Sequence, residues 1–116
     1  MSNNIGNADL IQQNFEMAER GDALVRELAK QGDLLAQANY AYYVQKRKTA
    51  YRLKAEGMAV TFIDTVLKGE PEVAILMRER DTAESRYRAT LESINMLKKN
   101  MAMVENQIQR EWSRSE

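Results

Sequence analysis

Basic and aromatic side chains are interleaved between Tyr40 and Lys54, and this segment carries the clearest local chemistry of the 116-residue sequence. Five of its side chains recur at spacings of three and four, which places them on one face of a helix. They are Tyr40, Tyr43, Arg47, Tyr51 and Lys54. Aromatic rings stack on unpaired bases, and cations neutralise phosphates. The candidate nucleic-acid-binding residues of the segment are Lys46, Arg47, Lys48, Tyr51, Arg52 and Lys54.

The same residues also suit a structural role. The tyrosines can fill the core of a helical bundle or an oligomer contact, and the charges can form a solvated face matched by Glu79, Asp81 and Glu84. The chain carries 17 Lys+Arg and 17 Asp+Glu. A net charge of zero disfavours a dedicated duplex binder, because phosphate neutralisation dominates that affinity. On the sequence, both interpretations of the tyrosines stay open.

The pairing of the segment within a hairpin decides which charges surround it. A register that pairs Glu56 with about Glu72 would place it beside four arginines, Arg78, Arg80, Arg86 and Arg88. Residues 46–88 carry ten Lys+Arg and seven Asp+Glu, and the remainder of the chain carries seven and ten. We therefore expect the molecule to be a modest electrical dipole.

Missing residue types exclude most familiar catalytic chemistry. The chain has no His and no Cys, which removes thiol nucleophiles, His-dependent triads and the usual zinc sites. Pairs of carboxylates such as Glu16 with Glu19, or Glu70 with Glu72, offer oxygen ligands of the kind that Mg²⁺ prefers. None of them has the spacing of a known motif, and there is no Gly-rich phosphate loop. We expect no enzyme activity, no metal and no cofactor.

The strongest structural signal lies in residues 71–112, which are predicted to form one long helix. Gly69-Glu70-Pro71 gives a break followed by a proline at a typical first helical position. A heptad pattern then continues to Glu111, and nine of its twelve core positions are apolar. Such a seam packs against another helix. The nine positions of this expected hairpin or oligomer seam are Val73, Leu76, Ala83, Tyr87, Ile94, Leu97, Met101, Val104 and Ile108.

Residues 9–56 supply the partner helix, after a tail at residues 1–8 that we expect to be frayed. The seam of this first arm is weaker, and Gly32-Asp33 either stops one helix and caps the next or lies within a continuous or kinked one. Between the two long segments, a short helix is predicted over 61–68. Thr61 and Asp64 have the spacing of a capping box that would open it.

These elements define an all-α fold and a single domain, residues 1–116. Two long segments joined by a compact turn pack as an antiparallel, coiled-coil-like helical hairpin with a short helix at the turn. The N-terminal segment either continues the first helix or forms a third. Ten apolar residues lie off the main seams: Ile11, Phe15, Val25, Tyr40, Tyr43, Tyr51, Leu91, Met96, Met103 and Trp112. Because a single hairpin would leave them uncovered, we expect a homodimer or higher oligomer.

The longest apolar stretch, Met58 to Ile63, is far shorter than the roughly 20 residues of a membrane-spanning helix. The N-terminus has neither a basic region nor an apolar run, so no signal peptide is expected. We therefore expect a cytoplasmic protein that has no membrane partner.

A set of residues between positions 50 and 112 carries a family resemblance. The set comprises 50–57, Thr61, Ile63, 67–69, 72–74, 78–81, Ala83, Glu84, Tyr87, Glu92, Ile94, Asn95, Lys98 and 107–112. Over about residues 40–112 the chain resembles small, uncharacterised helical proteins of tailed phages and prophages of Gram-positive bacteria. The resemblance implies an early gene region that also encodes recombination and single-strand-binding functions. It carries over no functional residue.

Three functions are compatible with these patterns. The leading hypothesis is a non-catalytic, oligomeric helical protein of phage or prophage origin that binds a host or phage protein. The second is a single-stranded nucleic-acid-binding accessory of phage replication or recombination, acting through the basic segment. The third is a structural or assembly component of the virion, which abundance in purified particles would distinguish from the other two.

Overall fold

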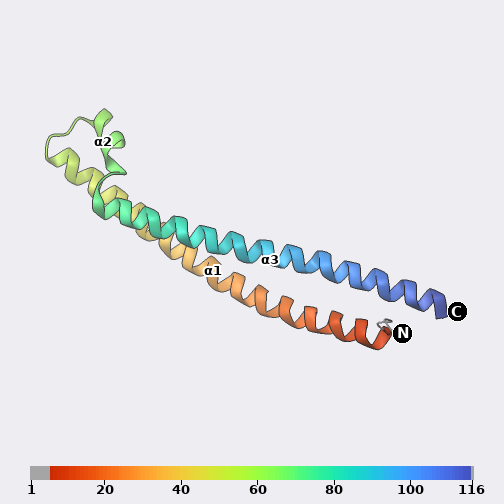
Figure 1. Ribbon diagram of the computed structural model, residues 1–116. Coiled ribbons are helices and arrows are strands. Elements are labelled where there is room, and N and C mark those ends of the chain that lie inside the picture. The colour runs from red at the N-terminus through yellow and green to blue at the C-terminus, as the bar shows by residue number, and fades with distance from the viewer. Residues whose placement is uncertain (1–5, 116) are drawn as a thin grey trace. The chain divides into compact units, whose positions relative to one another are not determined.

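The computed structural model describes residues 6–115, which form three helices (Figure 1). Helix α1 spans Asn7–Ala55, α2 spans Val60–Leu67 and α3 spans Pro71–Ser115. No strand occurs in the described part of the chain. The prediction of an all-α helical hairpin with a short helix at the turn is therefore confirmed.

Helix α1 is continuous through Gly32, so the N-terminal segment extends the first helix and does not form a third. The helix begins two residues earlier than predicted, because the carbonyl oxygen of Gly6 accepts hydrogen bonds from the backbone N–H groups of Asp9 and Leu10. The expected frayed tail otherwise falls on residues 1–5, which lie outside the described residues.

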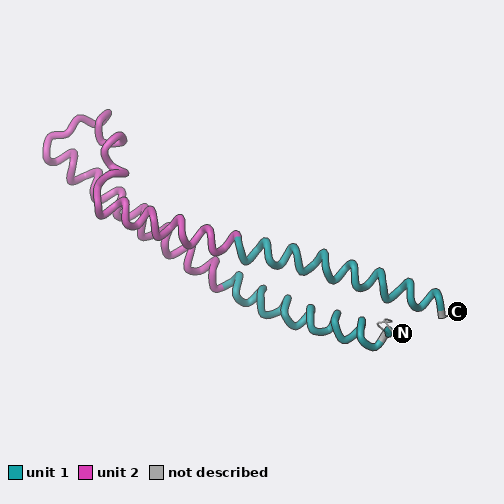
Figure 2. The backbone as a smooth tube through the Cα atoms, viewed as in Figure 1, with its two compact units in different colours: residues 1–29, 89–116 teal, residues 30–88 magenta. Residues whose placement is uncertain are grey.

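The chain divides into two compact units, each built from both long helices (Figure 2). Unit 1 comprises residues 1–29 and 89–116, and unit 2 comprises residues 30–88. Within each unit the segments of α1 and α3 run antiparallel. Gly21 lies beside Leu97 in unit 1, and Gly32 lies beside Tyr87 in unit 2. The sequence predicts a single domain. The heptad spacing is even along both long helices, so it gives no sign of the division into two units.

Both seams lie on the inward faces of the helices. In unit 2, Val73 is fully buried, and Leu76, Ala83 and Tyr87 are half-buried. In unit 1, Ile94 and Leu97 are buried, and the remaining seam residues, Met101, Val104 and Ile108, are half-buried. The α1 seam contributes Leu10 to unit 1 and Tyr42 and Thr49 to unit 2 as buried side chains.

The turn of the hairpin holds the hydrophobic core of unit 2. Helix α2 directs Ile63 and Leu67 into a cluster with Tyr42, Leu53 and Val73. The predicted capping box is wrong: Thr61 lies within α2 and is exposed, and no side chain caps the helix. The residue before the helix is Ala59, whose carbonyl accepts the backbone N–H groups of the first turn. Burial of the apolar face, with no help from a cap, therefore positions α2.

Gly57 ends α1 in a conformation that favours glycine. Its φ is +96°, and the N–H of Gly57 donates to the carbonyl of Lys54, while the N–H of Met58 donates to that of Leu53. This pair of bonds is the Schellman motif, in which an αL residue satisfies the last carbonyls of a helix. The predicted helix end at Glu56-Gly57 is therefore confirmed.

Gly57→Ala is expected to lower the free energy of unfolding by about 1 kcal/mol, since a Cβ is disfavoured at positive φ. A Cβ there would meet no atom within 4 Å, so the cost is conformational. Gly57→Asn should cost less, because Asn tolerates the αL region. Gly69→Ala, whose Cβ would make an ordinary 3.5 Å contact with the carbonyl oxygen of Val66, is the control for urea denaturation. Equal losses at the two glycines would contradict the assignment.

Candidate functional site

Three of the tyrosines that the sequence singles out are exposed on α1 in unit 2. The exposed fractions of Tyr40, Tyr43 and Tyr51 are 74%, 58% and 60%. The inward ring of this region is Tyr42, which is 3% exposed and packs in the core cluster. Tyr40, Tyr43 and Tyr51 therefore lie outside the core of the chain's own hairpin, and a role in binding or in an oligomer contact stays a prediction.

Two cations lie on the same face as the exposed rings. The guanidinium of Arg47 stacks 5.6 Å from the ring centroid of Tyr51, and Lys54 is exposed. Lys48 is exposed beside this face. Lys46 is half-buried, with its ammonium 5.7 Å from the ring centroid of Tyr42. Of the six predicted binding residues, the structure brings Arg47, Tyr51 and Lys54 together on one face.

Arg52 follows Tyr51 directly in α1, so it lies off this face, and acidic groups hold it. Its guanidinium is 2.8 Å from a carboxylate oxygen of Glu72, 3.2 Å from one of Glu56 and 3.6 Å from one of Glu70. Hydrogen bonds to Glu72 and Glu56 raise the pKa of Arg52. The pKa of the Glu72 carboxyl is lowered, first by a hydrogen bond from its own backbone N–H and then by one from Arg52. Arg52 therefore joins α1 to the start of α3, and it is unsuited to bind phosphate.

The pairing of the helices differs from the expected register. Glu72 lies opposite Thr49, whose hydroxyl donates to the Glu72 carboxylate at 3.4 Å, and not opposite Glu56. Further along, the guanidinium of Arg80 lies 4.4 Å from the ring centroid of Tyr42. The basic segment consequently faces Glu70 and Glu72 at its C-terminal end. Of the four arginines expected beside the segment, Arg80 contacts it at Tyr42, whereas the C-terminal end of the segment has acidic neighbours.

A second set of exposed residues lies on α1 in unit 1, and we call it the outer stripe. Its members recur at spacings of four and three, all six are exposed, and all but Asp22 are apolar. They are Ile11, Phe15, Ala18, Asp22, Val25 and Ala29. The sequence identified Ile11, Phe15 and Val25 only as off-seam residues. Their regular spacing, a second heptad beside the first, is the signal that would have shown them to be one surface.

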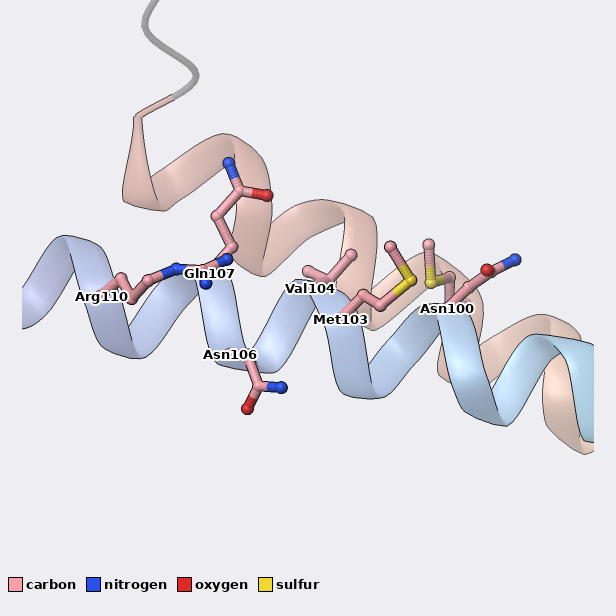
Figure 3. A pocket seen from close by; sticks show the side chains of 7 residues that line it. Asn100, Met103, Val104, Asn106, Gln107 and Arg110 are labelled. Carbon is pink, nitrogen blue, oxygen red and sulfur yellow. The ribbon is translucent and has the colours of Figure 1, made fainter.

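Unit 1 also contains an open groove of about 450 Å³ between α1 and α3. Met103, Val104 and Gln107 extend from α3 toward α1, whereas Asn106 extends away from it (Figure 3). The other lining residues are Met17, Asn100 and Arg110. A lining of methionine, amides and one cation offers pliable contacts, and it supplies no acid, base or nucleophile arranged for catalysis.

Other kinds of site have little support. Within residues 6–115, no group of three or more His, Cys, Asp or Glu side chains is placed to hold a metal ion. Among the helices of the described chain, none combines the length and the apolar character needed to cross a membrane. No protein-family model, curated protein or solved structure matches the chain.

Proposed function

We propose that the chain is a non-catalytic helical interaction protein that self-associates and presents its outer helix faces to other proteins. The outer stripe of unit 1 carries this proposal. Its three large side chains, Ile11, Phe15 and Val25, are 51–60% exposed. A helix that bears two adjoining heptad seams has the pattern of a bundle helix with two neighbours. Within residues 6–115, the chain supplies one such neighbour for this part of α1, which is α3.

A second copy of the chain suits the outer stripe, because the stripe is self-complementary. Antiparallel pairing of two stripes about their midpoint would set Phe15 against Val25 of the other copy and Ile11 against Ala29. Ile11 and Phe15 would then each meet a smaller side chain, as interdigitated packing requires, and Asp22 would lie against Ala18 near the centre of the pairing. Two-fold pairing of identical patches is also the commonest form of self-association. The resemblance to phage proteins supports an origin in a phage or prophage and action in the host cytoplasm, where a phage or host protein would be the further partner.

The oligomeric state of purified protein tests this proposal. Light scattering after size exclusion should give at least twice 13.4 kDa for the parent. Phe15→Glu with Val25→Glu should shift the mass toward that of the monomer, because buried unpaired charges oppose association. Gln12→Glu with Ala23→Glu, which adds the same charge at exposed positions off the stripe, is the matched control and should leave the mass unchanged. A parent that stays monomeric at about 100 μM, far above the Kd of most specific complexes, would refute self-association.

A further inference from the structure

We propose that the outer face of α1 in unit 2 binds single-stranded nucleic acid by stacking bases on its exposed tyrosines. We call this surface the tyrosine face, and it consists of Tyr40, Tyr43, Arg47, Tyr51 and Lys54. It lies in a different unit from the outer stripe and takes a different class of ligand. Its activity is therefore independent of the self-association proposed above.

The rings are available for stacking. Three of the five tyrosines of the chain lie on this face with more than half of their surface exposed. Every base has a π-face, so stacking on tyrosine tolerates any sequence, and each stacked base contributes about 5- to 150-fold in affinity. A role in the core of the chain's own hairpin would bury the rings, as is found for Tyr42.

The charge around the rings is positive and unopposed. No acidic residue occurs from Leu34 to Ala55, a stretch that contains five Lys+Arg. Within the described residues, Arg47, Lys48 and Lys54 form no ion pair with a carboxylate. Three neighbouring acids, Glu56, Glu70 and Glu72, are held by Arg52. Asp81, near the other end of the face, is paired with Arg80, which contacts the Tyr42 ring. Phosphates approaching the tyrosine face therefore meet cations and no free carboxylate of α1.

The spacing of the rings suits a short stretch of strand. From Tyr40 to Tyr51 the helix rises about 16 Å, at 1.5 Å per residue. That length matches about five stacked nucleotides at 3.4 Å each. Arg47 lies between Tyr43 and Tyr51 along the face and already stacks on the Tyr51 ring. A guanidinium in this position can contact a phosphate while the rings on either side hold bases.

A single strand fits this face better than a duplex. Paired bases turn their faces toward one another, so a duplex offers the tyrosines only its sugar–phosphate exterior. Duplex binding would then depend on phosphate neutralisation alone, and three free cations on a chain with zero net charge supply little of it. The preference for single strands distinguishes stacking from simple electrostatic attraction.

Fluorescence anisotropy with a labelled 20-nucleotide oligo-dT, and with its duplex as a control, tests the proposal. We expect the single strand to bind and the duplex to bind at least about tenfold more weakly. With three phosphates neutralised, the slope of log K against log salt should be about −2, so the affinity should fall about 20-fold between 50 and 200 mM salt. The proposal would be overturned if oligo-dT did not bind at 50 mM salt. It would also be overturned if heparin of matched charge, which has no bases to stack, bound as tightly as oligo-dT.

Matched variants locate the site. Tyr40→Ala, Tyr43→Ala and Tyr51→Ala combined should weaken binding by about 100-fold or more if each ring stacks a base, with unchanged helicity because all three rings are exposed. Phe62→Ala with Trp112→Ala, which removes exposed aromatics elsewhere, should leave the affinity unchanged. Arg47→Gln with Lys54→Gln should reduce the salt slope, whereas Arg52→Gln should not. Unchanged affinity in the tyrosine variant would overturn the proposal. The triple tyrosine variant should have the same mass by light scattering as the parent. Loss of nucleic-acid binding can therefore be distinguished from loss of self-association.

Discussion

Tyr42→Ala is expected to lower the free energy of unfolding by about 3–4 kcal/mol, whereas Tyr43→Ala should change it by less than about 1 kcal/mol. The two tyrosines are adjacent in sequence, and their rings lie 5.2 Å apart. Only the Tyr42 ring is packed in the core cluster of unit 2. Removing it leaves a cavity beside Leu53 and Val73, and it also removes the ring that Arg80 and Lys46 contact.

Urea denaturation followed by circular dichroism, at one protein concentration for all variants, measures this difference. Tyr42→Phe separates the hydroxyl from the ring, and it should retain most of the stability because the packed carbon atoms remain. Tyr43→Ala supplies the control for helix propensity, since it makes the same replacement one position along α1. Similar losses for Tyr42→Ala and Tyr43→Ala would mean that the two rings are packed alike, contrary to the structure.

The inward faces of the helices could be predicted because the heptad period is a local property. Every α3 seam position from Val73 to Glu111 is buried or half-buried. Pro71 begins α3, and Gly57 follows the C-cap of α1, since both residues act through their own backbone conformation. Such features need no knowledge of what packs against them.

The register of the hairpin could not be predicted from the seam. Thr49 occupies the place opposite Glu72 that was expected for Glu56, an error of seven residues, or one heptad. A shift by one heptad keeps every seam residue on the seam, so apolar burial hardly distinguishes the two pairings. The charges do distinguish them. The observed register brings Arg52 to Glu70 and Glu72, whereas the expected one would have set Glu56 against Glu72.

The tyrosine face could be predicted both in its spacing and in its position off the seam. Tyr40, Tyr43 and Tyr51 follow a helical repeat, and Tyr42 and Thr49 follow another beside it, which is the seam. A hairpin of two helices leaves the repeat of Tyr40, Tyr43 and Tyr51 uncovered. The absence of acids from Leu34 to Ala55 is the sequence signal that a free, basic surface would carry. The sequence does not reveal that Arg52 is held by acids, because two of its three partners, Glu70 and Glu72, lie about 20 residues away in the sequence.

Leu97→Ala is expected to lower the free energy of unfolding by about 2.5–4 kcal/mol, whereas Met96→Ala should lower it by less than about 1 kcal/mol. Leu97 is 6% exposed and Met96 is 57% exposed. Unit 1 has few fully buried apolar side chains, so the loss of one should open it locally. Amide hydrogen exchange should accelerate in residues 7–29 and 89–115 more than in the core of unit 2. Uniform acceleration along the chain would contradict a local role for Leu97.

Gly21 offers a second test of this packing. A Cβ at Gly21 would lie 3.4 Å from Cδ2 of Leu97, at the edge of ordinary contact. Replacing glycine by alanine in a helix interior usually raises the free energy of unfolding by about 1 kcal/mol. In the parent, Gly21→Ala should raise it by less, because Leu97 must shift. In the Leu97→Ala variant the new methyl group has room and fills part of the cavity, so the gain should be larger. Equal gains in the two backgrounds would show that α1 and α3 do not meet at these residues.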